Sequence, residues 1–91
     1  MPFPIWMVVT RFARQGETCA CCGKRLSLGN RDRGLRGAWH AHHIDGNRYN
    51  DRLSNCAVVC INAPENCHLN VAHQGSYTTG LAPRSYFTLV R

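Results

Sequence analysis

Short blocks of apolar residues alternate with polar segments along this chain, and each apolar block predicts one element. Residues 3–12 are apolar and rich in β-branched side chains, which predicts an N-terminal strand. Further short strands are expected over residues 38–44 and 56–60. Between them, Asp45-Gly46 favours a turn and a polar connector follows. The centre of the chain is therefore expected to hold two adjacent strands.

The downstream part of the pattern predicts a helix and a final strand. The helix is expected to begin near Pro64, with Asn62 or Ala63 as its cap, and to end by Gly75. Residues 86–90 are apolar enough for one more strand. This order of elements predicts a small α+β domain with flanking strands at both ends.

The size of the chain and its six cysteines suggest that a metal stabilises the fold. A chain of 91 residues forms a single domain, 1–91, with a marginal core, and such domains often recruit a disulfide or a structural metal. The N-terminus has no basic leader, and no apolar run is long enough to span a membrane. We therefore expect a cytoplasmic protein, in which clustered cysteines bind metal more often than they pair.

The spacing of the cysteines indicates a structural zinc site. Two residues between Cys19 and Cys22 allow both thiolates to face one tetrahedral ion, as in a zinc knuckle. The second pair is expected at the end of a strand and at the start of the helix. The expected zinc ligands are Cys19, Cys22, Cys60 and Cys67. Cys21 could replace a knuckle ligand, Cys56 suits a small buried position, and the alternative is a set of free buried thiols.

The net charge of +6 points to a polyanionic partner. All the basic side chains except Lys24 are arginines, whose planar fork binds phosphate oxygens with two hydrogen bonds. Arg48 and Arg52, in the connector between the central strands, are the favoured phosphate-binding candidates. The alternative is that the charge only keeps a small protein in solution.

Histidines and asparagines form the most specific pattern in the chain. Two adjacent histidines precede the Asp45-Gly46 turn, an asparagine follows about a dozen residues later, and two histidines fall in the predicted helix. The residues are His42, His43, Asn55, His68 and His73. Hydrolysis of a phosphodiester needs a base to activate water and a cation to neutralise developing charge. Adjacent strand residues point to opposite faces, so one histidine can bind the ion while its neighbour contacts water.

Residues 19–73 resemble the HNH endonucleases (ββα-metal or His-Me finger nucleases), in particular the small phage and mobile-element members. The resemblance implies a zinc-stapled ββα-metal core over 19–73, with arms at 1–18 and 74–91. It implies that His42 and His68 bind a catalytic divalent ion, that His43 is the general base, and that Asn55 steadies the loop carrying the base. An imidazole with the ordinary pKa near 6.5 suits that role. The expected function is metal-dependent DNA cleavage or nicking with Mg²⁺, Mn²⁺, Ni²⁺ or Zn²⁺.

The third ligand of this ion stays open at the level of sequence. His68 and His73 are five residues apart, which is about 140° around an ideal α-helix. The helix widens or ends locally so that His73 can bind the ion, or His73 lies near the ion without contacting it. Alternatively, Asn66 takes the place of His73, or phosphate completes the coordination of the ion. His40 is expected to be a neighbouring strand residue rather than a ligand.

Two rival functions belong to other classes. A catalytically inactive, zinc-ribbon-like nucleic-acid-binding module would need the cysteines and arginines but not His42, His43 and His68 together. A small secreted disulfide protein is disfavoured by the histidines and by the missing signal sequence. One active site cuts one strand, so a double-strand break would need a homodimer or two sequential events. The predicted strands at 3–12 and 86–90 could pair within the chain or serve as dimer arms.

Overall fold

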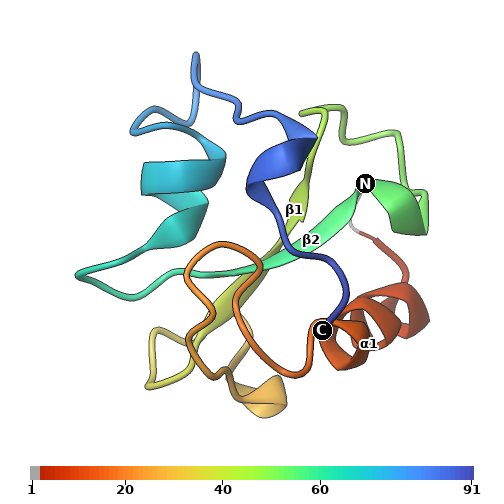
Figure 1. Ribbon diagram of the computed structural model, residues 1–91, viewed down its shortest axis with the longest axis vertical. Coiled ribbons are helices and arrows are strands. Elements are labelled where there is room, and N and C mark those ends of the chain that lie inside the picture. Colours follow the sequence, from red (N-terminus) through yellow and green to blue (C-terminus); the bar gives the residue numbers. More distant parts are fainter. Residues whose placement is uncertain (1–2) are drawn as a thin grey trace.

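The computed structural model describes residues 3–91, so residues 1–2 of the predicted N-terminal arm lie outside the described residues. Two strands cross the middle of the molecule, with the α-helix on one side and residues 61–80 on the other (Figure 1). The elements in order are α1 (Ile5–Arg14), η1 (Leu28–Asn30), β1 (Trp39–His43), η2 (Leu53–Asn55), β2 (Cys56–Cys60), η3 (His68–Ala72) and η4 (Arg84–Tyr86). This is a small α+β fold with a two-stranded antiparallel sheet, as the sequence predicted.

The sheet is the predicted central pair of strands. β1 and β2 are antiparallel, with Trp39 opposite Cys60 and His43 opposite Cys56. Every residue of β2 is buried, although β2 has only one partner strand among residues 3–91. Its outer edge is covered because the buried Gln15 carboxamide bonds both backbone groups of Val58, each at 2.9 Å. An edge strand covered in this way keeps its polar backbone groups satisfied.

The predicted strand over residues 3–12 is wrong, because this segment forms the helix α1. Its buried apolar side chains are Phe3, Met7, Val8 and Phe12. Spacings of three to four residues place such side chains on one face of a helix, whereas a half-buried strand would bury every second residue. The β-branched content misled the prediction, since burial of one helical stripe decided the outcome over local propensity.

The predicted C-terminal strand over residues 86–90 is also wrong. Within residues 3–91, this tail pairs with no strand, and it lies extended along α1 and the cysteine turn. Phe87 is buried, Thr88 donates its backbone N–H to the Ala20 carbonyl at 2.8 Å, and the Arg11 guanidinium donates to the Leu89 carbonyl at 2.8 Å. Such isolated bonds attach the tail without forming a ladder, so neither terminal segment is a strand that could act as a dimer arm.

The predicted helix from Pro64 to Gly75 is reduced to the short element η3, which is a π-helical turn. Asn66 has a positive φ of 32°, so the right-handed helical backbone does not begin before Cys67. Proline lacks an N–H and left-handed residues interrupt a right-handed helix, which explains the late start. Among the described residues, no helix is long and apolar enough to cross a membrane.

Candidate functional site

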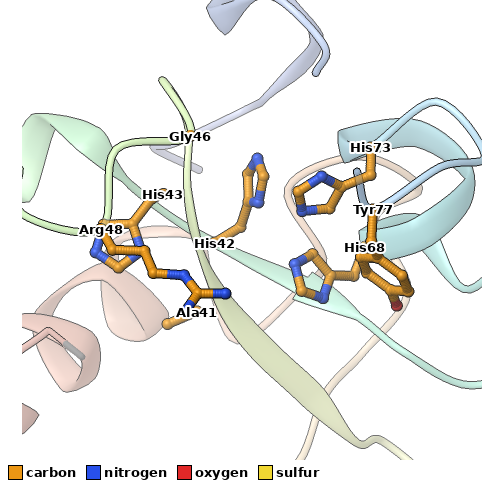
Figure 2. Close-up of a pocket in the computed structure, with 8 residues that line it drawn as sticks. All are labelled: Ala41, His42, His43, Gly46, Arg48, His68, His73 and Tyr77. Carbon is orange, nitrogen blue, oxygen red and sulfur yellow. The ribbon is translucent and has the colours of Figure 1, made fainter. Parts of the chain in front are cut away.

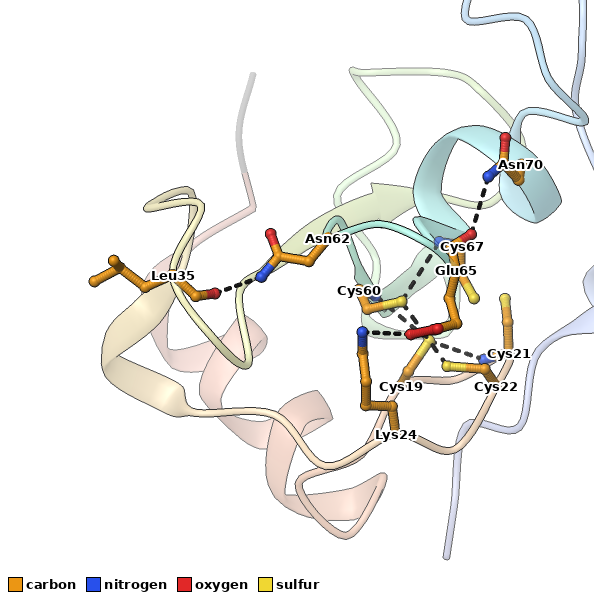
Figure 3. Close-up of polar contacts among 10 residues, drawn as sticks. All are labelled: Cys19, Cys21, Cys22, Lys24, Leu35, Cys60, Asn62, Glu65, Cys67 and Asn70. Carbon is orange, nitrogen blue, oxygen red and sulfur yellow. Dashed lines mark hydrogen bonds and ion pairs between the residues drawn. The ribbon is translucent and has the colours of Figure 1, made fainter.

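The four predicted cysteines meet at one point of the structure. One sulfur from each of Cys19, Cys22, Cys60 and Cys67 lies within 4.8 Å of the others (Figure 3). The Cys22 and Cys60 sulfurs are 3.8 Å apart. A tetrahedral zinc with zinc–sulfur distances of about 2.3 Å also separates its sulfurs by about 3.8 Å. The cluster can therefore hold one metal ion, and its four thiols fit a tetrahedral zinc.

Backbone geometry around the cluster favours thiolates. The turn after Cys19 closes because Cys19 N–H bonds the Lys24 carbonyl and Gly23 N–H bonds the Cys19 carbonyl. Backbone N–H groups point at sulfur: Cys21 and Cys60 donate to Cys19 Sγ, and Cys67 donates to Cys60 Sγ, each at 3.4 Å. Hydrogen bonds from the thiols of Cys21 and Cys60 lower the pKa of Cys19, whereas burial raises the pKa of Cys67 to about 12. A bound cation would remove the cost of several buried thiolates.

The two other cysteines lie outside this set. Cys56 is fully buried in β2, and burial raises the pKa of its thiol to about 11, which suits the predicted role as a small apolar residue. Cys21 lies between the two knuckle cysteines and is partly buried; its backbone N–H donates to Cys19 Sγ at 3.4 Å, and a side-chain hydrogen bond to Cys19 raises the pKa of its thiol. The salt bridge between Lys24 and Glu65, at 2.6 Å, joins the two segments that carry the cysteines.

A second possible metal group consists of three histidines. One ring nitrogen from each of His42, His68 and His73 lies within 4.8 Å of the others. His42 comes from β1, whereas His68 and His73 come from η3 and its C-cap. Figure 2 shows the three imidazoles directed toward a common space, with His43 on the other side of the strand. The adjacent histidines therefore point in different directions, as expected for successive strand residues.

The π-helical turn explains why two histidines five residues apart can join the group. His73 donates its backbone N–H to the carbonyl of His68 at 3.0 Å, which is the i to i+5 bond that defines a π-turn. An α-helix would place these side chains about 140° apart, but the wider turn brings them onto one face. Local widening, one of the alternatives left open by the sequence, is thus the arrangement found, and His73 joins the group.

Each histidine keeps one ring nitrogen suited to a metal. His42 is 3% exposed, and its Nε2 is buried without a hydrogen-bond partner among residues 3–91. The Nδ1 atoms of His68 and His73 are occupied by the His40 ring at 2.9 Å and by the Gly80 carbonyl at 3.1 Å, respectively. Burial lowers the pKa of His42 to about 3 and that of His68 to about 4. Neutral imidazoles with an unpaired nitrogen are the form that binds metal, so the group fits a divalent ion.

His43 is held in a fixed orientation beside this group. Its ring stacks on Phe3, with centroids 3.9 Å apart and planes 14° from parallel. Its Nε2 lies 3.1 Å from Asp51 Oδ1. Because an ionised carboxylate only accepts hydrogen bonds, this contact assigns the ring proton to Nε2 and leaves the Nδ1 lone pair available. No role for Asp51 was predicted from the sequence, since nothing in the spacing indicates that the connector folds back onto His43.

Asn55 organises the loop that follows His43. It is 5% exposed and accepts the Asp45 backbone N–H at 3.0 Å. Its amide donates to Asp45 Oδ1 and to the Asn50 carbonyl, each at 2.9 Å. Hydrogen bonds from Asn50 and Asn47 lower the pKa of Asp45. These contacts fix the turn after β1 and are those expected of a residue that steadies the loop.

The histidines open onto a cavity of about 350 Å³. The residues that line it are Ala41, His42, His43, Gly46, Arg48, His68, His73 and Tyr77. Arg48 thus lies at the site, whereas Arg52 is exposed and is not one of the lining residues. Tyr77, which the sequence did not indicate, packs edge-on against His68 at 5.4 Å between centroids.

Comparison of the chain with family models, with curated proteins and with solved structures gave no match. A function for this chain is therefore inferred from its own residues and their geometry.

Proposed function

We propose that the protein is a metal-dependent DNA endonuclease of the HNH, or ββα-metal, type. The observation that supports this most strongly is the grouping of four histidines around one cavity: His42, His68 and His73 with nitrogens directed at a common point, and His43 beside them. In addition, the strands β1 and β2 are followed by a short helical element that carries two of these histidines. The cysteine cluster would hold a structural zinc at the beginning of that element, η3, where Cys67 is the N-cap.

In the proposed reaction His43 is the general base. Nε2–H of His43 is donated to Asp51, so Nδ1 accepts a proton from water. The water oxygen forms a bond to phosphorus, the bond from phosphorus to the 3′ oxygen breaks, and that oxygen takes a proton from solvent. When bound to the three histidines, a divalent ion would neutralise negative charge that develops on the phosphate. Stacking on Phe3 and the bond to Asp51 keep the base oriented for this transfer.

DNA is the proposed substrate because an arginine lines the cavity and the chain carries a net charge of +6. Arg48 lines the cavity and could bind the phosphate next to the one that is cut. Contacts of this kind position a nucleic acid without reading its sequence. Arg52 is exposed at the start of η2, where it could bind a more distant phosphate.

The alternative function is a catalytically inactive, zinc-ribbon-like nucleic-acid-binding module. The cysteine cluster and the arginines would serve that function equally well. The module would, however, have no use for His42, whose buried Nε2 lacks a partner among residues 3–91. Leaving a buried polar group unpaired typically costs about 1–3 kcal/mol, which a ligated ion would offset. This observation favours the enzyme.

The direct test is cleavage of supercoiled plasmid by the purified protein. The protein is first treated with EDTA at a concentration that leaves the zinc content unchanged, and Mg²⁺, Mn²⁺, Ni²⁺ or Zn²⁺ is then added back. The proposal expects no cleavage after chelation and nicked plasmid with at least one added metal. DNA binding without cleavage, with every metal, would instead support the binding module.

A further inference from the structure

A chain of hydrogen bonds leads from the surface to one of the three clustered histidines. Asp32 Oδ1 lies 2.6 Å from His40 Nε2, and His40 Nδ1 lies 2.9 Å from His68 Nδ1. Asp32 belongs to the loop between η1 and β1, His40 to β1 and His68 to η3, so these hydrogen bonds join three separate segments. From the sequence, His40 was expected to be a neighbouring strand residue rather than a ligand, and no role was expected for Asp32.

The order of donors and acceptors in this chain follows from the carboxylate. An ionised Asp32 can only accept, so His40 Nε2 carries a proton and donates it. In a neutral imidazole the other nitrogen is then an acceptor, so His40 Nδ1 accepts from His68 Nδ1–H. The Nε2 atom of His68 is left unprotonated, with its lone pair available. One carboxylate thus sets the tautomers of two rings.

We propose that Asp32 and His40 are positioning residues that fix the tautomer and orientation of His68, so that its Nε2 binds the metal ion. The proposal rests on metal binding by the three histidines and requires no nuclease activity. Hydrogen bonding of a ligating histidine to a carboxylate or carbonyl is a general way of orienting metal ligands. Here an additional imidazole extends this arrangement, because Asp32 reaches His68 only through His40.

The loop backbone is arranged to present Asp32 to His40. Asp32 has a positive φ of 61°, a conformation that aspartate tolerates better than most residues. Its backbone N–H bonds the Trp39 carbonyl at 3.1 Å, directly beside His40 in β1. The loop closes where Gly37, with a φ of 80°, approaches Ser27 so closely that a Cβ would lie 2.9 Å from its nitrogen. This closure holds the carboxylate at the edge of β1.

Two readouts on the purified, zinc-containing protein test the proposal. The first is the affinity of the histidine group for Co²⁺, measured by calorimetry. The second is the ring-nitrogen chemical shifts of His68 in long-range ¹H–¹⁵N NMR spectra without added Co²⁺. We expect Asp32→Gly and His40→Ala to weaken Co²⁺ binding by about 10–100-fold. Asp32→Asn keeps an acceptor but loses the charge, so its affinity should lie between those of the wild type and Asp32→Gly.

Glu17→Gly provides the matched control. Glu17 is also an exposed acidic residue with a positive φ, of 60°, and it faces Arg25 rather than a histidine. Glycine removes the carboxylate at both positions without backbone strain. This variant should bind Co²⁺ as the wild type does.

The NMR spectra should show His68 protonated on Nδ1 in the wild type and as a mixture of tautomers in His40→Ala. Wild-type Co²⁺ affinity in Asp32→Gly and His40→Ala, or a wild-type His68 protonated on Nε2, would overturn the proposal. A wild-type protein that binds no Co²⁺ at its histidines would instead refute the proposed metal site. In that case the NMR spectra would still decide whether the hydrogen bonds from Asp32 through His40 set the tautomer of His68.

Discussion

The cysteine cluster and the histidine group can each hold a metal ion, but they differ in how they are enclosed. The cysteine cluster offers four thiols, three of them buried, and backbone N–H groups point at its sulfurs. The histidine group offers three nitrogens and borders a cavity. Four protein ligands complete a tetrahedral shell, whereas three leave a position for water or substrate. We therefore infer a structural role for the first and a catalytic role for the second.

The side chains around the two groups also differ in what they hold in place. Near the cysteines, the salt bridge between Lys24 and Glu65 joins two backbone segments. Near the histidines, polar side chains act on the rings themselves: Asp51 on His43 and His40 on His68. A structural site needs its segments held together, whereas a catalytic site needs its imidazoles oriented. This difference predicts that substitutions in the cysteine cluster lower the stability of the fold and that substitutions in the histidine group lower the rate of cleavage.

The largest effect is expected from removing a cysteine ligand. Cys60→Ala should prevent zinc binding and unfold the domain, because structural zinc in small domains contributes about 10–16 kcal/mol of apparent binding free energy. Metal analysis together with circular dichroism measures both outcomes. Cys56→Ala is the matched control, since Cys56 is equally buried in the same strand but is not in the cluster. Equal stability and zinc content in the two variants would refute the structural role.

The next largest effect is expected at the general base. His43→Ala should slow plasmid cleavage by about 10²–10⁴-fold, with zinc content and DNA affinity retained. His42→Ala should also be slow, but added metal should partly restore it, because this variant loses a ligand rather than the base. Cleavage rates over a range of metal concentrations separate the two variants. A His43→Ala protein that cuts near the wild-type rate would contradict the assignment.

A smaller effect is expected from substituting Asn55, whose side-chain hydrogen bonds hold the loop after His43 rather than the cysteine cluster. Asn55→Ala should lower the free energy of unfolding by about 1–3 kcal/mol, because the Asp45 backbone N–H and the Asn50 carbonyl lose a buried partner. Denaturant titration measures this loss. Cleavage should also slow, because the loop after His43 loosens, while the zinc content should stay at one per chain. Loss of zinc from this variant would mean that the two regions are not independent.

The smallest effect is expected at the edge of the cavity. Arg48→Ala should weaken DNA binding similarly for all sequences and lower the slope of log affinity against log salt by about one. Affinity measured between about 50 and 200 mM salt tests this. Arg25, in the segment after the cysteine turn and outside the histidine cavity, provides the comparison. If Arg25→Ala weakened binding more than Arg48→Ala, the DNA would lie over the cysteine side.

The sequence predicted what depends on short-range spacing. The meeting of the Cys19 and Cys22 sulfurs and the strand Cys56–Cys60 were both predicted correctly, because local geometry determines them. The N-terminal strand was predicted wrongly, because residues 3–12 include several β-branched side chains yet bury a helical stripe. The period of that stripe was present in the sequence and would have identified the helix.

Other features of the site could not be inferred from spacing. The π-turn between His68 and His73 is closed by a backbone hydrogen bond between these two residues, and it follows an irregular segment around Pro64. Asp32 and Asp51 reach their histidines through loops, and nothing local in a sequence determines where a loop returns. Long-range contacts of this kind follow from the packing of the whole domain.

The contrast between the two groups is tested most directly by one chelator titration of the metal-loaded protein. Metal content, circular dichroism and plasmid nicking are followed on the same samples as the chelator concentration rises. The account predicts two separate steps: nicking is lost first, with one zinc and the folded spectrum retained, and zinc and fold are lost together later. Nicking that persists until the zinc and the fold disappear, or that is absent from the fully loaded protein, would contradict it.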